Sequence, residues 1–261
     1  MVTGGGHGIG AATARACARA GSRTVLIADR DLPAAEKAAA ACEEVGAAAE
    51  ALVVDVADAG AMASLAEAVE RRHGPLDVLI NNAGVGMSGR FLDVGADDWE
   101  WIRSINLDGV LNGCRAFGPA MVARGRAHVV NVSSGLAYTP RATEPAYVTT
   151  KAAVLAFSQC LRADWARHGV GVSAICPGII NTGIVDRARF LGDQADPTSV
   201  RRARKAFKRG HSADQVADAV IDAVIRDRAV VPVGWESRLG WVAHRMLPLS
   251  VQQIVAKAGP R

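Results

Sequence analysis

Three residues of this chain are of types that can transfer a proton together: Tyr147, Lys151 and, further upstream, Ser134. Side chains four positions apart share one face of a helix, so a helix here would place the Lys151 ammonium beside the Tyr147 phenol. A tyrosine with a pKa of about 10 is a poor base at neutral pH, but a nearby positive charge favours the phenolate. Ser134 follows an apolar run and could hydrogen-bond a substrate oxygen. The Tyr/Lys spacing is common in proteins and becomes informative only beside a second motif.

The second motif is the glycine-rich turn near the start of the sequence, Thr3-Gly4-Gly5-Gly6-His7-Gly8-Ile9-Gly10. Such a turn lets the backbone approach a pyrophosphate, which would lie at the N-terminus of the following helix. Similar turns are common, but here a strand follows and ends at Asp29, whose carboxylate could bind both hydroxyls of an adenosine ribose. A turn-capping carboxylate is the alternative for Asp29. The motif predicts a dinucleotide, with NAD(H) favoured over NADP(H), although Arg30 and His7 could hold a 2′-phosphate.

Two further motifs each follow a strand-like run: Asp55-Val56 and Asn81-Asn82-Ala83-Gly84. Ligands of open parallel sheets bind beyond the carboxyl ends of the strands, so both motifs would lie along a bound dinucleotide. We expect the first motif near the adenine and the second near its ribose. Turn residues that merely close a strand are the alternative for either motif taken alone.

The elements that must position these residues alternate along the chain. Short β-branched runs predict strands over 24–28, 51–54, 78–81, 128–132, 170–175 and 229–233. Alanine-rich stretches predict helices over 8–20, 32–45, 58–73, 97–124, 146–168 and 212–226. Strands that are apolar on both faces and separated by helices indicate a parallel sheet covered on both sides. The sequence therefore predicts a doubly wound α/β fold, with residues 1–261 forming one domain.

Two regions depart from this alternation. Residues 179–210 form an insertion after a strand, and we expect this insertion to act as a lid over the substrate. Its basic run, 201–209, is interpreted as a solvated helix face, with a contact to an anionic substrate tail or a membrane surface as the alternative. Residues 235–258 form an apolar tail that we expect to pack on a second subunit or at the substrate mouth.

Composition limits the classes of protein that remain. Half of the 261 residues are hydrophobic, which excludes a disordered chain, and no apolar run is long enough to cross a bilayer. The N-terminal residues lack the pattern of a signal peptide, so we expect a cytoplasmic protein. The five cysteines are scattered without metal-ligand spacing, and no metal site is expected. The net charge of +4 is mild, and Phe207 is the only aromatic residue in the basic run, so nucleic acid is not an expected partner.

In their order and separations, these motifs resemble the short-chain dehydrogenase/reductase family over nearly the whole chain. The family's T-G-x-x-x-G-x-G, N-N-A-G and Y-x-x-x-K motifs match residues 3–10, 81–84 and 147–151. Its catalytic asparagine and serine match Asn106 and Ser134, and its P-G motif with a downstream threonine matches Pro177, Gly178 and Thr182. The resemblance implies a Rossmann-type, mainly parallel seven-stranded sheet in a three-layer α/β/α sandwich. It also implies NAD(P)-dependent hydride transfer to or from an alcohol or carbonyl compound.

The resemblance further implies a role for each matching residue. Tyr147 exchanges the proton, and Lys151 lowers its pKa and binds the nicotinamide ribose. Ser134 orients the substrate oxygen, and Asn106 holds a water that links Lys151 to solvent. The residues expected to contact the cofactor are Gly4, Gly8, Ile9, Gly10, Asp29, Asp55, Val56, Asn82, Ala83, Gly84, Tyr147, Lys151, Pro177, Gly178, Ile180 and Thr182.

Two departures from the family pattern bear on these expectations. Only Met1 and Val2 precede Thr3, so the first strand is either truncated or starts upstream of this sequence. The last strand runs into Trp235-Glu236-Ser237 and lacks the glycine-rich ending of tetrameric acyl-carrier-protein reductases. A homo-oligomer is expected, and the sequence leaves open whether it is a dimer or a tetramer.

The substrate is expected to be a small molecule, an apolar alcohol or ketone. Apolar residues gather near the expected site in sequence, with ordinary core packing as the alternative; they are Val85, Met87, Phe91, Leu136, Tyr138, Ile184 and Phe190. A non-catalytic dinucleotide sensor of the same fold is the competing function. A sensor needs the glycine turn but no proton relay, so the complete set of acid/base residues argues against it.

Overall fold

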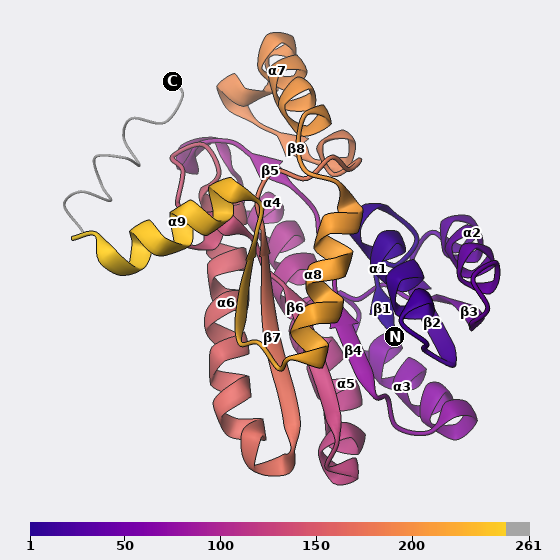
Figure 1. Ribbon diagram of the computed structural model, residues 1–261. Helices are drawn as coiled ribbons and strands as arrows, with labels where there is room; N and C mark the ends of the chain where they lie inside the picture. Colours follow the sequence, from indigo (N-terminus) through magenta and orange to yellow (C-terminus); the bar gives the residue numbers. More distant parts are fainter. Residues whose placement is uncertain (249–261) are drawn as a thin grey trace.

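The computed structural model describes residues 1–248 and is built around a parallel sheet of seven strands (Figure 1). The strands are β1 (Val2–Thr3), β2 (Thr24–Asp29), β3 (Ala48–Val53), β4 (Val78–Asn81), β6 (Ala127–Val132), β7 (Val170–Pro177) and β9 (Val230–Val233). Their spatial order is β3-β2-β1-β4-β6-β7-β9, so the direction of winding reverses beside β1. In open α/β sheets the crevice at such a reversal, beyond the carboxyl ends of the strands, is where ligands bind.

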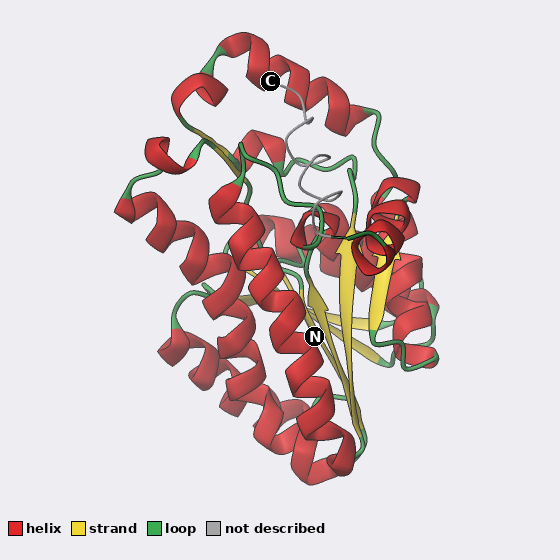
Figure 2. Ribbon diagram, turned by 90° about the vertical axis from the view of Figure 1, so that its left-hand side faces the viewer, coloured by secondary structure: helices red, strands yellow, loops and turns green. Residues whose placement is uncertain are grey.

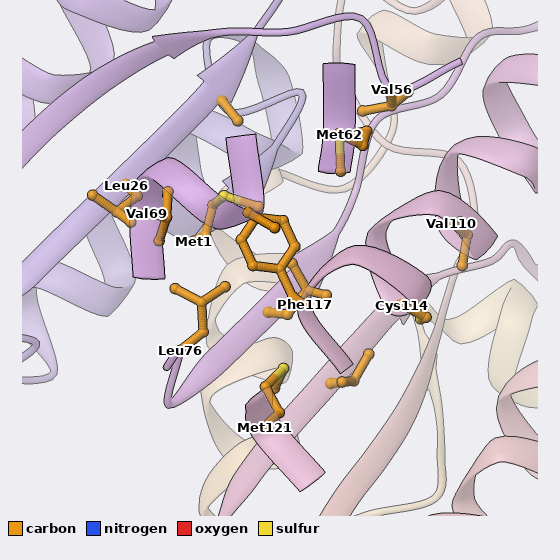
Figure 3. Packing of buried hydrophobic residues seen from close by; sticks show 14 of the residues in the cluster. Met1, Leu26, Val56, Met62, Val69, Leu76, Val110, Cys114, Phe117 and Met121 are labelled. Carbon is orange, nitrogen blue, oxygen red and sulfur yellow. The ribbon is translucent and has the colours of Figure 1, made fainter. Parts of the chain in front are cut away.

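Helices cover both faces of the sheet and give the three-layer sandwich that the sequence predicts. On one face lie α1 (Gly8–Arg19), α2 (Leu32–Glu43) and α8 (Ala213–Ile225), packed on Val25, Ile27 and Ile175. On the other lie α3 (Ala59–His73), α5 (Gly109–Arg124) and α6 (Pro145–Trp165); Figure 3 shows the part of this core around Phe117 and Met121. Successive strand residues point to opposite faces of the sheet. Because helices cover both faces, residues on both sides are apolar and each strand is an almost unbroken apolar run.

The first strand is short but central. Val2 and Thr3 pair with Ile27 and Ala28 of β2, and Val2 also pairs with Ile80 of β4. The expected short first strand is thus present between two longer neighbours. It carries Thr3 to the start of the glycine turn.

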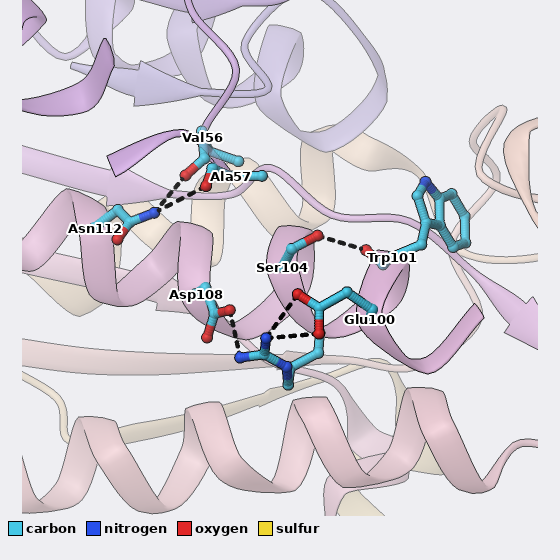
Figure 4. A network of polar contacts seen from close by, with 8 residues as sticks. Val56, Ala57, Glu100, Trp101, Ser104, Asp108 and Asn112 are labelled. Carbon is cyan, nitrogen blue, oxygen red and sulfur yellow. Dashed lines mark hydrogen bonds and ion pairs between the residues drawn. The ribbon is translucent and has the colours of Figure 1, made fainter. Parts of the chain in front are cut away.

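The predicted helix over 97–124 is interrupted in the structure. α4 (Ala96–Arg103) runs through a π-helical turn, Ser104–Asp108, into α5. The Arg103 guanidinium pairs with Glu100 on one side of this turn and with Asp108 on the other (Figure 4). π-turns are frequent at functional sites because they change the direction of a side chain within a helix. Here the turn contains Asn106, and apolar periodicity gave no sign of it.

The structure contains two short strands, one after β4 and one after β7, that the sequence pattern did not predict. β5 (Met87–Ser88) and β8 (Arg189–Phe190) pair as a separate parallel two-stranded sheet. The basic helix α7 (Pro197–Lys208) follows, and α9 (Trp235–Met246) lies beyond β9; Figure 2 shows the same arrangement from the side. Of the predicted tail 235–258, residues 249–258 lie outside the described part of the chain. No helix within residues 1–248 has the length and apolar character needed to span a membrane.

A buried polar cluster joins the amino ends of β6 and β7. The His128 imidazole lies 2.8 Å from the Ser173 hydroxyl, which donates to the Arg228 carbonyl, so His128 is the donor to Ser173. The other imidazole nitrogen lies 3.8 Å from Asp227, which also accepts two hydrogen bonds from Arg162. Burial lowers the pKa of His128, and Arg162 contributes to the decrease, while Asp227 opposes it.

This cluster predicts a loss of stability in mild acid. Above the unfolded-state pKa of about 6.5, His128 is neutral in both states and has no effect. As the pH falls below that value, the unfolded chain gains a proton that the folded chain does not, so the free energy of unfolding decreases by up to about 1.4 kcal/mol per pH unit. Melting temperatures of the wild type and of His128→Gln, measured from about pH 7.5 to about pH 5, should diverge, with the wild type losing more. Parallel curves would contradict the assignment.

Candidate active site

A cavity of about 1810 Å³ lies beyond the carboxyl ends of the strands. Its wall includes residues that follow β1, β2, β3, β4, β6 and β7, and it extends to α7 and α9. Of the predicted catalytic and cofactor residues, all line this cavity except Gly10 and Asn106. The motifs that are far apart in sequence therefore meet at one place.

The glycine turn leads from β1 into α1. Gly4 and Gly8 have φ angles of +60° and +50°, which side chains other than glycine adopt only with strain. Gly10 has a different reason to be glycine: a Cβ atom there would lie 2.1 Å from the Gly4 carbonyl oxygen. Gly10 therefore allows the helix to pack against its own turn, which explains why it does not line the cavity. The turn leaves a backbone surface at the N-terminus of α1 that suits an anionic phosphate group.

Asn82, which follows the neighbouring strand β4, holds this turn in place. Its side-chain amide donates to the carbonyl oxygens of Thr3 and Gly4, at 2.9 and 3.1 Å. The Thr3 hydroxyl accepts hydrogen bonds from the backbone amides of Asn82 and Ala83 in return. Two motifs that are separate in the sequence thus form one hydrogen-bonded unit.

Asp29 ends β2 at the rim of the cavity. One carboxylate oxygen accepts from the Gly6 amide at 2.9 Å, and the other accepts from the Asp31 amide at 3.1 Å. Each oxygen retains a second lone pair, so the carboxylate can both brace the glycine turn and accept from ribose hydroxyls. His7 lies 3.4 Å from Asp31, and Arg30 also lines the cavity.

The three acid/base candidates come together on α6 and the turn after β6. Lys151 is 4% exposed, donates to the Val132 carbonyl at 3.0 Å, and has its Nζ atom 5.9 Å from the centre of the Tyr147 ring. Ser134 begins a short 3-10 turn and is buried. The i, i+4 spacing therefore does place the ammonium and the phenol on the same wall of the cavity.

Burial dominates the ionisation of this site. It raises the pKa of Tyr147 to about 12; a hydrogen bond with Ser134 opposes this rise and Glu144 adds to it. Burial also lowers the pKa of Lys151 to about 8. The direction for Tyr147 is opposite to the expected one, because the loss of hydration on burial outweighs the opposing hydrogen bond with Ser134. The protein alone therefore favours the phenol over the phenolate.

Asn106 takes a position that the sequence did not suggest. It is fully buried in the π-helical turn, where its side chain accepts from the Val85 amide at 2.8 Å and donates to the Val85 carbonyl at 3.0 Å. The residue thus clamps the strand-end loop that carries Gly84. A Cβ atom at Gly84 would lie 3.2 Å from both the Asn106 side-chain oxygen and the Lys151 ammonium. The Asn106 side chain therefore shapes the site from behind its wall.

The segment after β7 is fixed by residues that belong to none of the sequence motifs. Glu236, at the start of α9, accepts from the Ile179 amide at 2.7 Å and lies 2.9 Å from His211. The backbone of His211 pairs with that of Ile180 in an isolated parallel β-bridge. This pairing holds the segment that contains Pro177, Gly178 and Thr182 at the cavity wall. The sequence signal was weak, because a single glutamate after the last strand is not a recognisable pattern.

Six of the seven residues expected around the substrate line the cavity, namely Val85, Met87, Leu136, Tyr138, Ile184 and Phe190. Phe91 does not, and that expectation is wrong. It lies in a 3-10 turn beyond β5, is 65% exposed, and packs edge-on against Trp99. One side of α9 also faces the cavity through Ser237 and Gly240, and its Trp241 packs against Tyr138. The opposite side of α9 exposes Trp235, Leu239, Val242 and Met246.

Comparison with known proteins agrees with this geometry. A model of the family described as short chain dehydrogenase matches residues 1–190. The chain belongs to the short-chain dehydrogenase family. It is 42% identical over 257 residues to a Mycobacterium tuberculosis protein named "Probable oxidoreductase EphD", a match that covers 96% of this chain and 43% of the relative. The chain therefore spans less than half the length of that protein.

Solved structures of family members share the whole fold. A short-chain dehydrogenase/reductase from Burkholderia phymatum in complex with NAD has a TM-score of 0.84 and 28% identity, and the match covers 100% of this chain and 95% of that one. A metagenomic short-chain oxidoreductase in complex with NADP has a TM-score of 0.72 and 29% identity, with coverage of 88% and 92%. These matches confirm the predicted family and the Rossmann-type seven-stranded fold.

Proposed function

We propose that this chain catalyses hydride transfer between a nicotinamide dinucleotide and an alcohol or carbonyl carbon, with Tyr147 as the proton-transfer residue. The observation that carries this proposal is the position of Ser134, Tyr147 and Lys151 on one wall of the cavity that also contains the glycine turn. A bound NAD(P) would supply the hydride acceptor or donor. The alternative of a non-catalytic sensor leaves this proton-transfer group without a purpose.

Each catalytic residue has a task in this proposal. The Tyr147 phenol donates a proton to the substrate oxygen in reduction and accepts it in oxidation. Ser134 holds the same oxygen and hydrogen-bonds Tyr147, which eases deprotonation. Lys151, buried beside the ring, contributes positive charge and a donor for a ribose hydroxyl, and Asn106 keeps the adjoining loop in place. A water at Asn106 would connect Lys151 to solvent.

The cofactor site fits a dinucleotide from one end to the other. The glycine turn and the N-terminus of α1 suit the pyrophosphate, Asp55 and Val56 the adenine, and the segment from Pro177 to Thr182 the nicotinamide. We propose NAD(H) as the preferred cofactor because Asp29 ends β2 where a 2′-phosphate would meet its negative charge. NADP(H) is the alternative that Arg30 and His7 would favour.

Asp29→Ala tests this preference. Removal of the carboxylate should reduce the ratio of kcat/KM with NAD(H) to kcat/KM with NADP(H) by about tenfold or more, because a ribose partner and a like charge are lost together. Steady-state kinetics with both dinucleotides measure the ratio. Glu36→Ala, which removes an exposed carboxylate of α2 that does not line the cavity, is the control. A wild-type preference for NADP(H) would show that Arg30 and His7 outweigh Asp29.

The remaining features of the proposal concern substrate, assembly and location. The substrate-side wall favours an alcohol or ketone with a largely apolar body, and residues 179–210 act as its lid in the domain formed by residues 1–261. The exposed apolar side of α9 supports a homo-oligomer, dimer or tetramer, and the composition supports a cytoplasmic location. Turnover of a panel of alcohols and ketones, followed by cofactor absorbance with each dinucleotide, tests the function. Dinucleotide binding without turnover of any member would favour the sensor.

A further inference from the structure

Where the cavity reaches the loops after β5 and β6 and helix α7, a part that we call the outer cavity, arginines line its wall. It is bounded by the loops around Arg90 and Arg141, by the turn that ends at Arg187, and by α7, which contributes Arg202. Within residues 1–248 none of these four guanidinium groups has an ion pair, whereas the nearby Arg189 and Arg204 pair with Asp98 and Asp186. Four guanidinium groups that have no ion pair among the described residues thus line one cavity.

Acidic side chains do not balance these arginines. Of the carboxyl groups that line the cavity, Asp29 and Asp55 lie at the ends of β2 and β3, and the other two are those of Glu144 and Glu236. Glu236 is already held by the Ile179 amide and His211. Burial raises the pKa of Glu144, against a smaller opposing effect of Arg141, and so disfavours its charged form. The outer cavity therefore has a net positive potential, which would attract an anion.

The geometry of α7 separates one arginine from the rest of its basic run. The residues of α7 that line the cavity are Ser199, Arg202, Ala203, Ala206 and Phe207. Their spacing is that of a single helix face. Arg201, Lys205 and Lys208 lie off this face and do not line the cavity. The basic run thus has a solvated side, as its composition suggests, and one arginine on the side of the substrate.

We propose that the outer cavity binds an oxyanion, a carboxylate or a phosphate group, at the far end of an otherwise apolar substrate, and that Arg202 is a specificity-determining residue for it. This inference rests on the proposed function and names the substrate class of that site. A guanidinium presents paired N–H donors that match the oxygens of either anion. The same cavity is also lined by the apolar side chains of Ile184, Phe190 and Phe207, which suit an aliphatic body.

The test compares two arginines that are neighbours in sequence. Arg202→Gln and Arg201→Gln each remove one positive charge from α7, so they change the long-range field equally and differ in the cavity contact. The probes are levulinate, its longer methyl-ketone homologues, the methyl ester of each, and the corresponding phosphonates. Turnover is measured by cofactor absorbance with each dinucleotide, and binding of the same probes by calorimetry.

We expect the acids to have higher kcat/KM and tighter binding than their esters. Arg202→Gln should lower both for the acids by about three- to tenfold and leave the esters nearly unchanged, while Arg201→Gln should have less than about a twofold effect on either. The more affected series, carboxylates or phosphonates, identifies the anion. Equal effects of the two variants, or equal losses for acids and esters, would overturn the inference.

The failure of this inference and the failure of the proposed function give different results. If the ketone groups of the esters and of the acids are turned over with equal kcat/KM in every variant, the oxidoreductase function stands and the anion site does not exist. If nothing is turned over, yet the acids bind more tightly than the esters and Arg202→Gln abolishes the difference, the anion site stands and the catalytic proposal fails.

Discussion

Replacement of Tyr147 by phenylalanine is expected to lower kcat by about 10²–10⁴-fold, the usual contribution of a general acid or base. The substitution removes one oxygen atom and keeps the ring that packs beside Lys151. Dinucleotide affinity should therefore change little. Steady-state kinetics in both directions and a dinucleotide titration measure the two effects separately.

The other tyrosine of the chain supplies the control. Tyr138 also lines the cavity, but its hydroxyl is bonded to Ser237, 3.1 Å from the carbonyl oxygen. Tyr138→Phe should lose far less activity than Tyr147→Phe and should mainly affect the contact between α9 and the turn after β6. If the Tyr147 variant retained more than about half of the wild-type kcat, another group would have to be the proton donor.

Lys151→Arg is expected to be the second most damaging change, with a loss of about 10²-fold in kcat/KM. The charge is retained, but a planar guanidinium cannot occupy the space of a compact ammonium. That space is narrow, because Nζ lies 3.0 Å from the Val132 carbonyl and Gly84 leaves room on the other side only by lacking a side chain. Displacement of the cation would alter both the phenol and the nicotinamide-ribose contact.

Kinetics combined with dinucleotide titration distinguish the two parts of this effect. A higher dissociation constant would report the ribose contact, and a lower kcat at saturation would report the phenol. Lys205→Arg, on the outer side of α7, is the control for a lysine-to-arginine exchange. A fully active Lys151→Arg variant would mean that charge alone suffices.

Much of the fold followed from the sequence because local and global signals agreed. Apolar runs such as that of β2 fit only a strand buried on both faces, and alternation with alanine-rich helices leaves few topologies. The glycine turn and the Tyr147/Lys151 spacing placed the site for the same reason, since each motif carries its own local geometry. These patterns depend on residues near one another in sequence.

The parts that were missed depend on contacts between distant residues. The π-helical turn around Asn106 is invisible to a periodicity of 3.6 residues, and the bond between Glu236 and Ile179 joins two segments that share no motif. The pKa of Tyr147 moved in an unexpected direction because burial cannot be read from spacing. Phe91 was misplaced because an apolar side chain in a loop gives no indication of which way it faces.

The segment that we propose as a lid, residues 179–210, has consequences for how substrate preference can change. Backbone hydrogen bonds fix this segment near its middle, where β8 pairs with β5, and at its end, where His211 pairs with Ile180. Residues 191–209 therefore form a cassette between two fixed points, and none of the proposed acid/base residues belongs to it. Exchange of residues 191–209 between relatives would replace one wall of the proposed substrate site and leave the proposed hydride-transfer residues unchanged. Selection, natural or in the laboratory, could thus diversify substrates without rebuilding the enzyme.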